Sequence, residues 1–298
     1  MQQKTSARQP GIFLNKVYLL SSLSTAVDRL TVVLSHDVDS VKRPLSHILA
    51  RRKRFAAKDL LKHFLKITNL YNNFSIMADA EEKLGYRSTI FVPVGLFSLD
   101  EVLDTLKSLE KEGWEIGYHP VVSGNQTYGL LKLGLDYLKY LGFNVKGVRA
   151  HYLIYTPSLL DCYRRLGILY DSSLRAEEAG KYSPFVEKGL VELPIGLMDA
   201  DVFGRLMVSD ESKAWKYIMW KLSLVEKSEE RVFVVLFHQE ALRMRGGRLY
   251  FRLLEYLHEK EYTVCKCIEV VEKALREVKN EAPSFRNRCR RGRRSKLH

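Results

Sequence analysis

The chain has 298 residues, of which 46% are hydrophobic and 28% are charged. This balance is typical of a soluble globular protein with a sizeable core, and it argues against a disordered or fibrous chain. The apolar runs all fall short of the roughly 18 residues that a membrane-spanning helix needs, so we expect no transmembrane segment.

The formal charge of +13 is concentrated in two short segments. Four basic residues stand together at 51–54. A run after Ser284 contains no acid and seven basic residues: Arg286, Arg288, Arg290, Arg291, Arg293, Arg294 and Lys296. Such an end is typical of a solvated, disordered tail, and the alternative is electrostatic contact with nucleic acid or an anionic surface. No aromatic residue follows Phe285, so we expect no base stacking there.

The first 29 residues precede the first predicted strand, and we interpret them as an N-terminal extension. Within them, residues 17–27 are apolar and follow basic residues, as in a secretory signal, but four of the eleven are Ser or Thr. The cysteines lack the two-residue spacing of a zinc ribbon or redox motif, which favours buried, reduced thiols: Cys162, Cys265, Cys267 and Cys289. We therefore expect a cytoplasmic location, with secretion as the alternative.

Apolar, strand-like runs alternate with amphipathic helical patterns over residues 30–280. The predicted strands are residues 30–35, 88–94, 115–119, 145–150, 190–193, 231–237 and 262–267. The predicted helices are residues 58–71, 100–112, 130–141, 157–166, 213–225, 248–260 and 268–278. This alternation predicts a mainly parallel sheet, open or closed into a barrel. No repeat or linker divides the region, so we interpret residues 30–280 as one domain and residues 281–298 as a basic tail.

The first predicted helix has an apolar stripe along one side. Its members are spaced as neighbours on a helix surface: Leu61, Phe64, Leu65 and Thr68.

Chemically active side chains stand just after several predicted strands. Asp37 and Asp39 follow the first strand, in Leu34-Ser-His-Asp-Val-Asp39. Others follow the third, fourth and sixth strands: His119, Arg149, His151 and His238. Each has a structural alternative, such as a cap, a turn or an ordinary hydrogen bond. Active sites of parallel α/β folds form at the carboxyl ends of strands, however, so their joint placement predicts one site at that rim.

The order of these motifs resembles the polysaccharide deacetylase superfamily, which is related to carbohydrate esterase family four, over residues 30–267. Leu34-Ser-His-Asp-Val-Asp39 resembles the first motif, in the branch that has Asp-x-Asp, and Trp114-Glu-Ile-Gly-Tyr-His119 resembles the His-bearing motif. Further matches follow in order: Ser88-Thr-Ile-Phe-Val92, Val148-Arg-Ala-His-Tyr-Leu153, Tyr170-Asp-Ser-Ser-Leu174, Glu192-Leu-Pro194 and Leu236-Phe-His238. The resemblance implies a distorted (β/α) barrel of about seven strands and a metal-dependent sugar deacetylase.

The resemblance also implies roles for the residues at the rim. Asp37 would be the general base and His238 the general acid. Asp39 and His119 would bind the metal. Arg149 would orient Asp37 and keep it ionised.

One position departs from the family's pattern. A second metal-binding His usually stands four residues after the first, and here that position is Ser123. His151, at an adjacent strand end, is the candidate replacement and would complete an Asp/His/His set suited to zinc or a similar divalent ion. The alternatives are a water molecule, or Ser123 acting through water. His36 is expected to point away from Asp37, because successive residues of a strand face opposite sides.

The predicted roles have a physical rationale. Asp37 and Asp39 are residues i and i+2 of an extended segment, so they face one site. Two unpaired carboxylates that close would repel each other, and a divalent cation on Asp39 and a guanidinium on Asp37 keep both ionised. The cation would polarise a carbonyl and activate water, Asp37 would accept the water's proton, and His238 would protonate the leaving nitrogen.

The sequence therefore predicts a zinc-dependent hydrolase that removes acetyl groups from an N-acetylated sugar or glycoconjugate. Tyr118, Tyr152 and Asp199 are the predicted substrate contacts, whereas Asp171 is interpreted as structural. The alternatives are hydrolysis of another non-peptide C–N bond, such as that of a cyclic amide, and a catalytically silent carbohydrate-binding barrel. Nucleic-acid binding through residues 51–54 and the tail is a further alternative.

Overall fold

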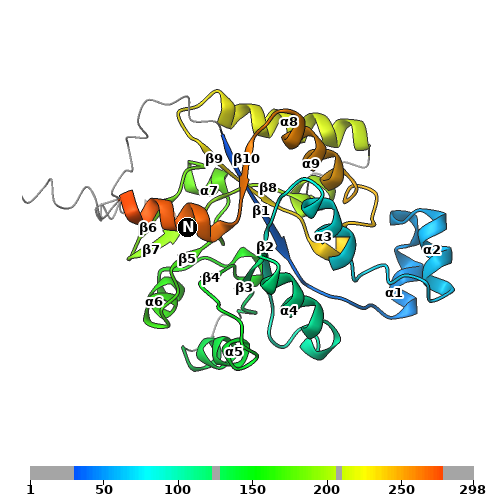
Figure 1. Cartoon of the computed structure of the whole chain (residues 1–298), viewed down its shortest axis with the longest axis horizontal. Coiled ribbons are helices and arrows are strands. Elements are labelled where there is room, and N and C mark those ends of the chain that lie inside the picture. The colour runs from blue at the N-terminus through cyan, green and yellow to red at the C-terminus, as the bar shows by residue number, and fades with distance from the viewer. Residues whose placement is uncertain (1–29, 123–127, 206–209, 278–298) are drawn as a thin grey trace, which may run out of the picture.

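The structure is a computed structural model that describes residues 30–122, 128–205 and 210–277 (Figure 1). The predicted N-terminal extension at 1–29, the basic tail at 281–298 and Ser123 lie outside the described residues. Within the three described ranges, no helix combines the length and the apolarity that crossing a bilayer would require.

A ten-stranded sheet forms the centre of the molecule (Figure 1). Its order is β6-β7-β5-β4-β3-β2-β1-β9-β8, and β10 pairs with the first half of β1. All neighbours are parallel except β6 and β7. The strands are β1 Thr31–Asp37, β2 Thr89–Val92, β3 Glu115–Tyr118, β4 Gly147–Val148, β5 Tyr170–Asp171, β6 Phe185–Glu187, β7 Leu190–Glu192, β8 Ile195–Met198, β9 Val232–Leu236 and β10 Thr263–Cys265.

The sheet curls until its two end regions meet. Arg175, just after β5, forms a parallel bridge with Ile195 at the start of β8, and the Leu174 carbonyl accepts a hydrogen bond from the Ile195 N–H at 2.8 Å. This contact gives the distorted barrel that the motifs implied. All seven predicted strands are present. Three further strands, β5, β6 and β8, are two to four residues long and were not predicted.

Helices surround the curled sheet (Figure 1). Their bounds are α1 Leu45–Ala50, α2 Ala57–Phe64, α3 Phe74–Glu82, α4 Leu103–Lys111, α5 Tyr128–Tyr140, α6 Pro157–Arg165, α7 Ala176–Ala179, α8 Glu211–Glu226 and α9 Leu249–Glu259, and residues 267–277 form a last helix. The helix predicted at 58–71 ends earlier, at Phe64, because Lys66 adopts a left-handed conformation with φ of 59°. Its apolar stripe is also not packed on the sheet, since Leu61 and Leu65 are exposed.

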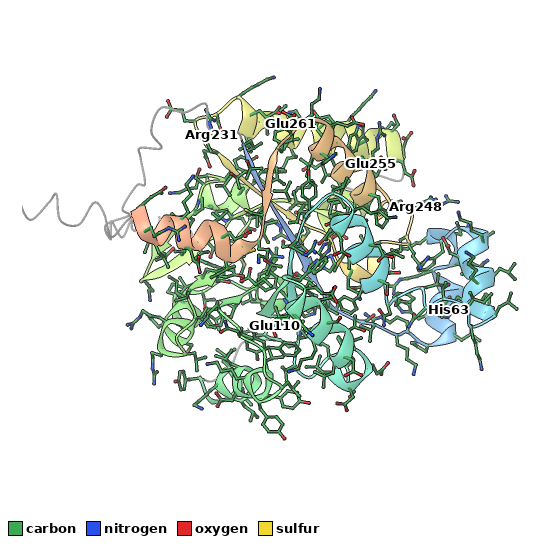
Figure 2. The ribbon with its side chains drawn as sticks, viewed as in Figure 1. His63, Glu110, Arg231, Arg248, Glu255 and Glu261 are labelled. Carbon is green, nitrogen blue, oxygen red and sulfur yellow. The ribbon has the colours of Figure 1, made fainter. Side chains whose placement is uncertain are left out.

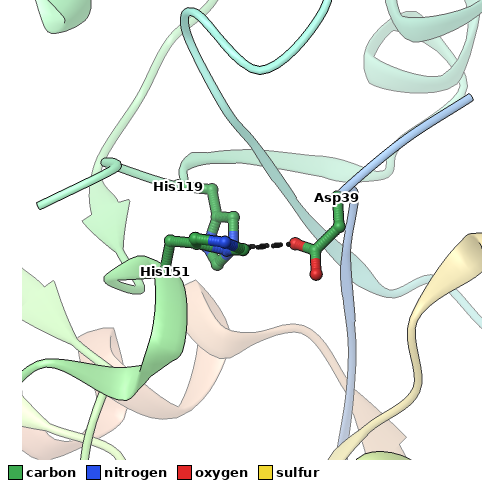
Figure 3. Close-up of side chains that lie close together, drawn as sticks. All are labelled: Asp39, His119 and His151. Atoms are coloured by element: carbon green, nitrogen blue, oxygen red, sulfur yellow. Dashed lines mark hydrogen bonds and ion pairs between the residues drawn. The ribbon is translucent and has the colours of Figure 1, made fainter.

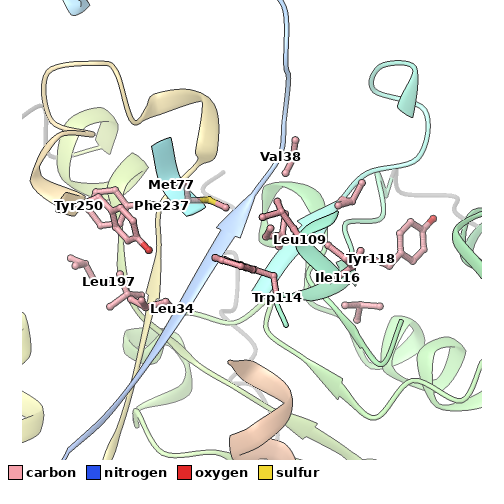
Figure 4. Packing of buried hydrophobic residues seen from close by; sticks show 14 of the residues in the cluster. Leu34, Val38, Met77, Leu109, Trp114, Ile116, Tyr118, Leu197, Phe237 and Tyr250 are labelled. Carbon is pink, nitrogen blue, oxygen red and sulfur yellow. The ribbon is translucent and has the colours of Figure 1, made fainter. Parts of the chain in front are cut away.

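Two apolar clusters lie on opposite faces of the sheet. Val32 and Leu34 of β1 belong to the larger one, between sheet and helices, where Ile116 of β3 and the preceding Trp114 also pack (Figure 4). Val33 belongs to the smaller one, which fills the inside of the curled sheet. This alternation has a period of two, as strand geometry requires. It also decides which rim residues face the inside of the barrel.

Candidate active site and metal centre

The last residues of β1 point in opposite directions. Asp37 is four positions after Val33 and faces the inside of the barrel as Val33 does, whereas His36 is two positions after Leu34 and faces the surrounding helices. His36 is fully buried, with Nδ1 2.8 Å from the Phe237 carbonyl oxygen and Nε2 2.9 Å from Glu81 Oε1. This placement confirms that His36 faces away from Asp37. Its role is to fasten β1 to the surrounding helices.

Glu81 is the centre of the polar cluster around His36. It is fully buried and accepts hydrogen bonds from Tyr250 Oη at 2.6 Å, Trp114 Nε1 at 2.7 Å and Ser88 Oγ at 2.8 Å. Because every donor is buried with it, the carboxylate is stabilised without water. Nothing in the sequence around Glu81 distinguished it from a surface helix residue.

Asp39, His119 and His151 bring three potential metal-ligand atoms together (Figure 3). Asp39 Oδ1 lies 3.3 Å from His119 Nε2 and 3.3 Å from His151 Nδ1, and the two nitrogens are 3.2 Å apart. The three atoms therefore form a nearly equilateral triangle. Burial raises the pKa of Asp39, but hydrogen bonds with His119 and His151 and the charge of His238 outweigh it and hold that pKa well below its usual range. Among the described residues, this is the group with metal-ligand geometry.

The two imidazoles are held by their surroundings. His119 Nδ1 lies 2.6 Å from the Arg149 carbonyl oxygen, so it donates there and Nε2 is left with its lone pair toward the triangle. His151 begins a short turn in which Tyr152 and Leu153 have φ of 59° and 54°, and the Tyr152 ring lies 4.0 Å from that of His151. Left-handed residues that are not glycine are rare and cluster at functional sites.

Arg149 lies beneath the triangle and binds Asp37. Its Nη1 donates to Asp37 Oδ1 at 3.0 Å, and its other nitrogens donate to the carbonyl and hydroxyl oxygens of Ser172 at 2.9 and 2.8 Å. The guanidinium also stacks 4.3 Å from the Phe91 ring, and it is completely buried. The second carboxylate oxygen of Asp37 lies 4.0 Å from His119 Nε2, beside the triangle.

His238 lies beside Asp39 of the triangle. Its Nδ1 donates to Asp199 Oδ1 at 2.7 Å, and its backbone N–H donates to Asp199 Oδ2 at 3.0 Å. Nε2 is therefore turned toward the site, 3.7 Å from Asp39 Oδ2. Burial lowers the pKa of His238, but the charge and hydrogen bond of Asp199 raise it, and the result lies well above the ordinary value.

These residues line a pocket of about 340 Å³. Asp37, Asp39, His119, His151 and His238 all contribute, as does the predicted substrate contact Tyr152. The remaining lining residues were not predicted: Leu153, Arg175, Met198, Ala200 and Asp201. Arg175 follows the Tyr170-Asp-Ser-Ser-Leu174 motif directly, so its position beside that motif was the available signal.

Two predicted substrate contacts lie elsewhere. Tyr118 belongs to the outer cluster, where its hydroxyl reaches Gly134 of α5 so closely that a Cβ there would lie 2.1 Å away. Burial raises the pKa of Tyr118 to about 12. Asp199 is 4% exposed and is absent from the pocket lining, because both its oxygens bind His238. Its position is that of a group that orients His238.

The chain resembles known proteins in its structure, whereas its sequence gives no match. No protein-family model matches the chain, and no curated protein matches it by sequence. A candidate polysaccharide deacetylase from Mycobacterium smegmatis has the same fold, with a TM-score of 0.62 and 19% identity over 87% of this chain and 94% of that one. A second candidate, from Pseudomonas aeruginosa PAO1, has a TM-score of 0.59 and 13% identity over 82% and 91%.

A further match differs in its described activity. Puue allantoinase has a TM-score of 0.60 and 15% identity, over 84% of this chain and 91% of that one. At identities this low, the matches establish the architecture. The chain has the distorted (β/α) barrel fold of the polysaccharide deacetylases.

Proposed function

We propose that the chain is a zinc-dependent hydrolase that removes the acetyl group from an N-acetylated sugar or glycoconjugate. The observation that carries this proposal is the triangle of Asp39 Oδ1, His119 Nε2 and His151 Nδ1. The carboxylate of Asp37, which binds Arg149, and the imidazole of His238, which binds Asp199, lie in the same pocket. The resemblance of the rim motifs to the polysaccharide deacetylases supports the choice of substrate.

The dimensions of the triangle favour a tetrahedral ion. Ligands about 2.0–2.1 Å from zinc at the corners of a tetrahedron lie about 3.3–3.4 Å from one another. Neighbouring ligands of an octahedral magnesium site lie closer, at about 2.9 Å. The observed edges of 3.2, 3.3 and 3.3 Å fit the tetrahedron better. Two imidazoles and one carboxylate also suit zinc, and a fourth position would remain for water or substrate.

The chain's own residues supply the proton transfers. When bound, the ion would act as a Lewis acid toward the acetyl carbonyl and the attacking water. Asp37 accepts the water's proton, because Arg149 binds only one of its two oxygens and the other lies beside the triangle. His238 donates a proton from Nε2 to the leaving nitrogen, and Asp199 keeps the imidazole charged until that transfer.

A second C–N hydrolysis remains a specific alternative. Puue allantoinase shares the fold at nearly the same TM-score as the candidate deacetylases. Hydrolysis of a cyclic amide needs the same base, the same acid and the same polarised carbonyl. The reaction products distinguish the two candidate functions. An N-acetylated sugar releases acetate, whereas a cyclic amide opens without losing a carbon fragment.

Metal content is the first test. We expect about one zinc ion per chain in the wild type, and loss of the ion in His119→Ala and in His151→Ala. His258→Ala, on the exposed side of α9, is the matched control and should keep it. Ser123→Ala should also keep it if His151 replaces the usual second histidine. A wild-type chain that takes up no zinc, cobalt or nickel would contradict the proposed hydrolase.

A further inference from the structure

The segment between β1 and α3 forms an arm whose root lies near the pocket. Residues 42–67, which we call the arm, contain α1 and α2 and extend from the rest of the molecule (Figure 1). The arm begins three residues after Asp39, and its root is fixed beside His238. The Gln239 side-chain amide donates to the carbonyl oxygens of Ser40 at 2.7 Å and Tyr71 at 3.0 Å, one on each side of the arm.

The arm is held in a defined position. Ile48 and Phe55 are buried with Leu70 and Tyr71 in a small apolar cluster of their own, against which Leu60 packs. Two backbone contacts then join the arm to the loop that follows His238: a bridge between Phe55 and Met244, and a hydrogen bond of 2.7 Å from the Arg245 N–H to the Arg54 carbonyl. The surface of the arm is therefore fixed relative to the pocket.

That surface is strongly basic. The arm has nine basic residues, all exposed: Lys42, Arg43, Arg51, Arg52, Lys53, Arg54, Lys58, Lys62 and Lys66. Its one acid, Asp59, is buried and lies 3.7 Å from Arg243, outside the arm. Burial and the charges of Arg51, Arg43 and Arg54 lower the pKa of His47, as expected where cations gather without acids.

The same surface is unusually apolar. Six of the fifteen large hydrophobic side chains exposed in the described residues belong to the arm: Leu45, Leu49, Leu61, Phe64, Leu65 and Ile67. Leu61 of α2 and Leu65, which caps the end of that helix, are 60% and 61% exposed, and Lys58 and Lys62 stand near them in the sequence. In Figure 2 the side chains around His63 spread outward from the arm. A soluble surface rarely gathers so many exposed apolar groups without a partner.

We propose that the arm docks on the surface of an anionic lipid bilayer and so seats the mouth of the pocket at the membrane. Exposed aliphatic and aromatic side chains would enter the boundary between headgroups and acyl chains, and the surrounding Lys and Arg would contact anionic headgroups. α2 has eight residues, so it lies on a bilayer and does not cross it.

The combination of exposed cations and exposed apolar side chains argues against two other partners. Nucleic acid would be bound by the cations, but it offers no apolar surface for Leu61 or Leu65. A second copy of the chain would cover the apolar side chains, but it would also bring two sets of nine cations together. An anionic bilayer can bind both the cations and the exposed apolar side chains of the arm.

The docking proposal has a consequence for the substrate, which rests on the proposed function. A deacetylase whose pocket opens at a bilayer would act on an acylated sugar that is carried by a lipid. Vesicle binding is measured without substrate, so failure of docking and failure of deacetylation are separate results.

The test is flotation of the full chain with vesicles. We expect binding to phosphatidylcholine vesicles that contain phosphatidylserine, weaker binding to phosphatidylcholine alone, and weakening by salt. Leu61→Ser/Leu65→Ser should lower the apparent affinity about tenfold or more. The matched control is Leu130→Ser/Leu133→Ser, whose side chains are 53% and 67% exposed on α5, and it should bind as the wild type does. Lys58→Gln/Lys62→Gln should also bind more weakly, with Lys213→Gln/Lys216→Gln on α8 as its control.

Three results would overturn the proposal. The first is no flotation of the wild type, and the second is equal flotation of wild type and Leu61→Ser/Leu65→Ser, which would place any lipid contact outside the arm. The third is a wild-type dimer in solution that Leu61→Ser/Leu65→Ser converts to a monomer with no change in lipid binding, which would make this face a contact between copies. Circular dichroism of each variant checks that it is folded.

Discussion

Asp199 binds His238 through both carboxylate oxygens, one to the backbone N–H at 3.0 Å and one to Nδ1 at 2.7 Å. The double contact fixes both the position of the residue and the rotation of its ring. It also sets the protonation state, because the buried carboxylate outweighs the effect of burial and holds the pKa of His238 well above its ordinary value.

We expect Asp199→Asn to shift the pH dependence of activity. The substitution removes the charge that favours imidazolium, so the pKa of His238 falls. A general acid must carry its proton, so activity is lost as pH rises through that pKa, and the falling limb of the profile should move to lower pH. The value of kcat should drop by about 10²-fold.

The measurement is kcat against pH for the wild type and the variant, with the His238 ring resonances titrated by NMR as a readout independent of turnover. Asp136→Asn, an exposed carboxylate on α5, is the control. A falling limb that stays in place would mean that His238 is not the group whose protonation limits the reaction.

Arg149→Met tests the buried ion pair with Asp37. Both side chains are nearly or completely inaccessible, so the variant leaves Asp37 in the interior without its cation. Breaking such a pair from one side costs about 3–5 kcal/mol of unfolding free energy. Urea unfolding measures this loss. Arg87→Met, a partly exposed arginine beside Glu82, should lose about 1 kcal/mol or less, and equal losses would contradict the argument.

The alternation of strands and helices was enough to predict a mainly parallel sheet, and the resemblance of the motifs implied its closure into a distorted barrel. Central parallel strands such as β9 are buried on both faces, so residues 232–237 form a continuous apolar run, and an amphipathic helix follows most of the strands. The missed strands β5 and β8 are short, and β8 also contains Gly196, which packs against the Phe233 ring where a Cβ would not fit.

The site was predictable as far as strand ends determine it. The structure brings five residues at or just after strand ends to one pocket: Asp37, Asp39, His119, His151 and His238. Tyr118 was assigned to that pocket although it directly precedes His119, and neighbouring strand residues face opposite sides. Trp114 and Ile116, at every second position before Tyr118, also lie in the outer cluster, so the same alternation indicates the outward direction of Tyr118.

Partners that meet only through tertiary contact were not predictable. Asp199 and His238 are 39 positions apart, and His36 and Glu81 are 45 apart, so no local pattern joins them. The direction in which the stripe of Leu61 and Leu65 faces was not predictable for a different reason. Helical periodicity identifies an apolar face but does not say whether that face meets the core or another surface.

Tyr152→Ala should separate substrate binding from chemistry. The Tyr152 side chain is 83% exposed, lines the pocket and covers the His151 ring. Loss of an exposed aromatic face that stacks on a sugar removes binding that is equal in ground and transition states. We expect KM to rise about threefold to tenfold while kcat stays within about twofold. Zinc content of the variant must be unchanged. A fall in kcat at constant KM would show that Tyr152 acts through His151 instead.

Asp171 and Glu192 are neighbours on β5 and β7 and place two carboxyl groups side by side in the interior. Burial raises the pKa of Asp171 to about 7, and burial together with the charge of Asp171 raises that of Glu192 well above its usual range. One oxygen of Glu192 accepts the Leu174 N–H at 3.0 Å, and the other has no hydrogen-bond partner among the described residues. The pair therefore retains protons that the unfolded chain releases near pH 4.

Glu192→Gln should stabilise the protein more at pH 8 than at pH 5. Both pKa values are higher in the folded state, so the stability of the wild type is fully present below about pH 4 and declines as pH rises through about 7. Gln cannot ionise and keeps the oxygen that accepts the Leu174 N–H. Relative to the wild type, the variant should gain about 1–2 kcal/mol between the two pH values in urea unfolding. Glu101→Gln, an exposed residue, should gain nothing. An advantage that shrinks as pH rises would mean that Glu192 is ionised and stabilised in the folded protein.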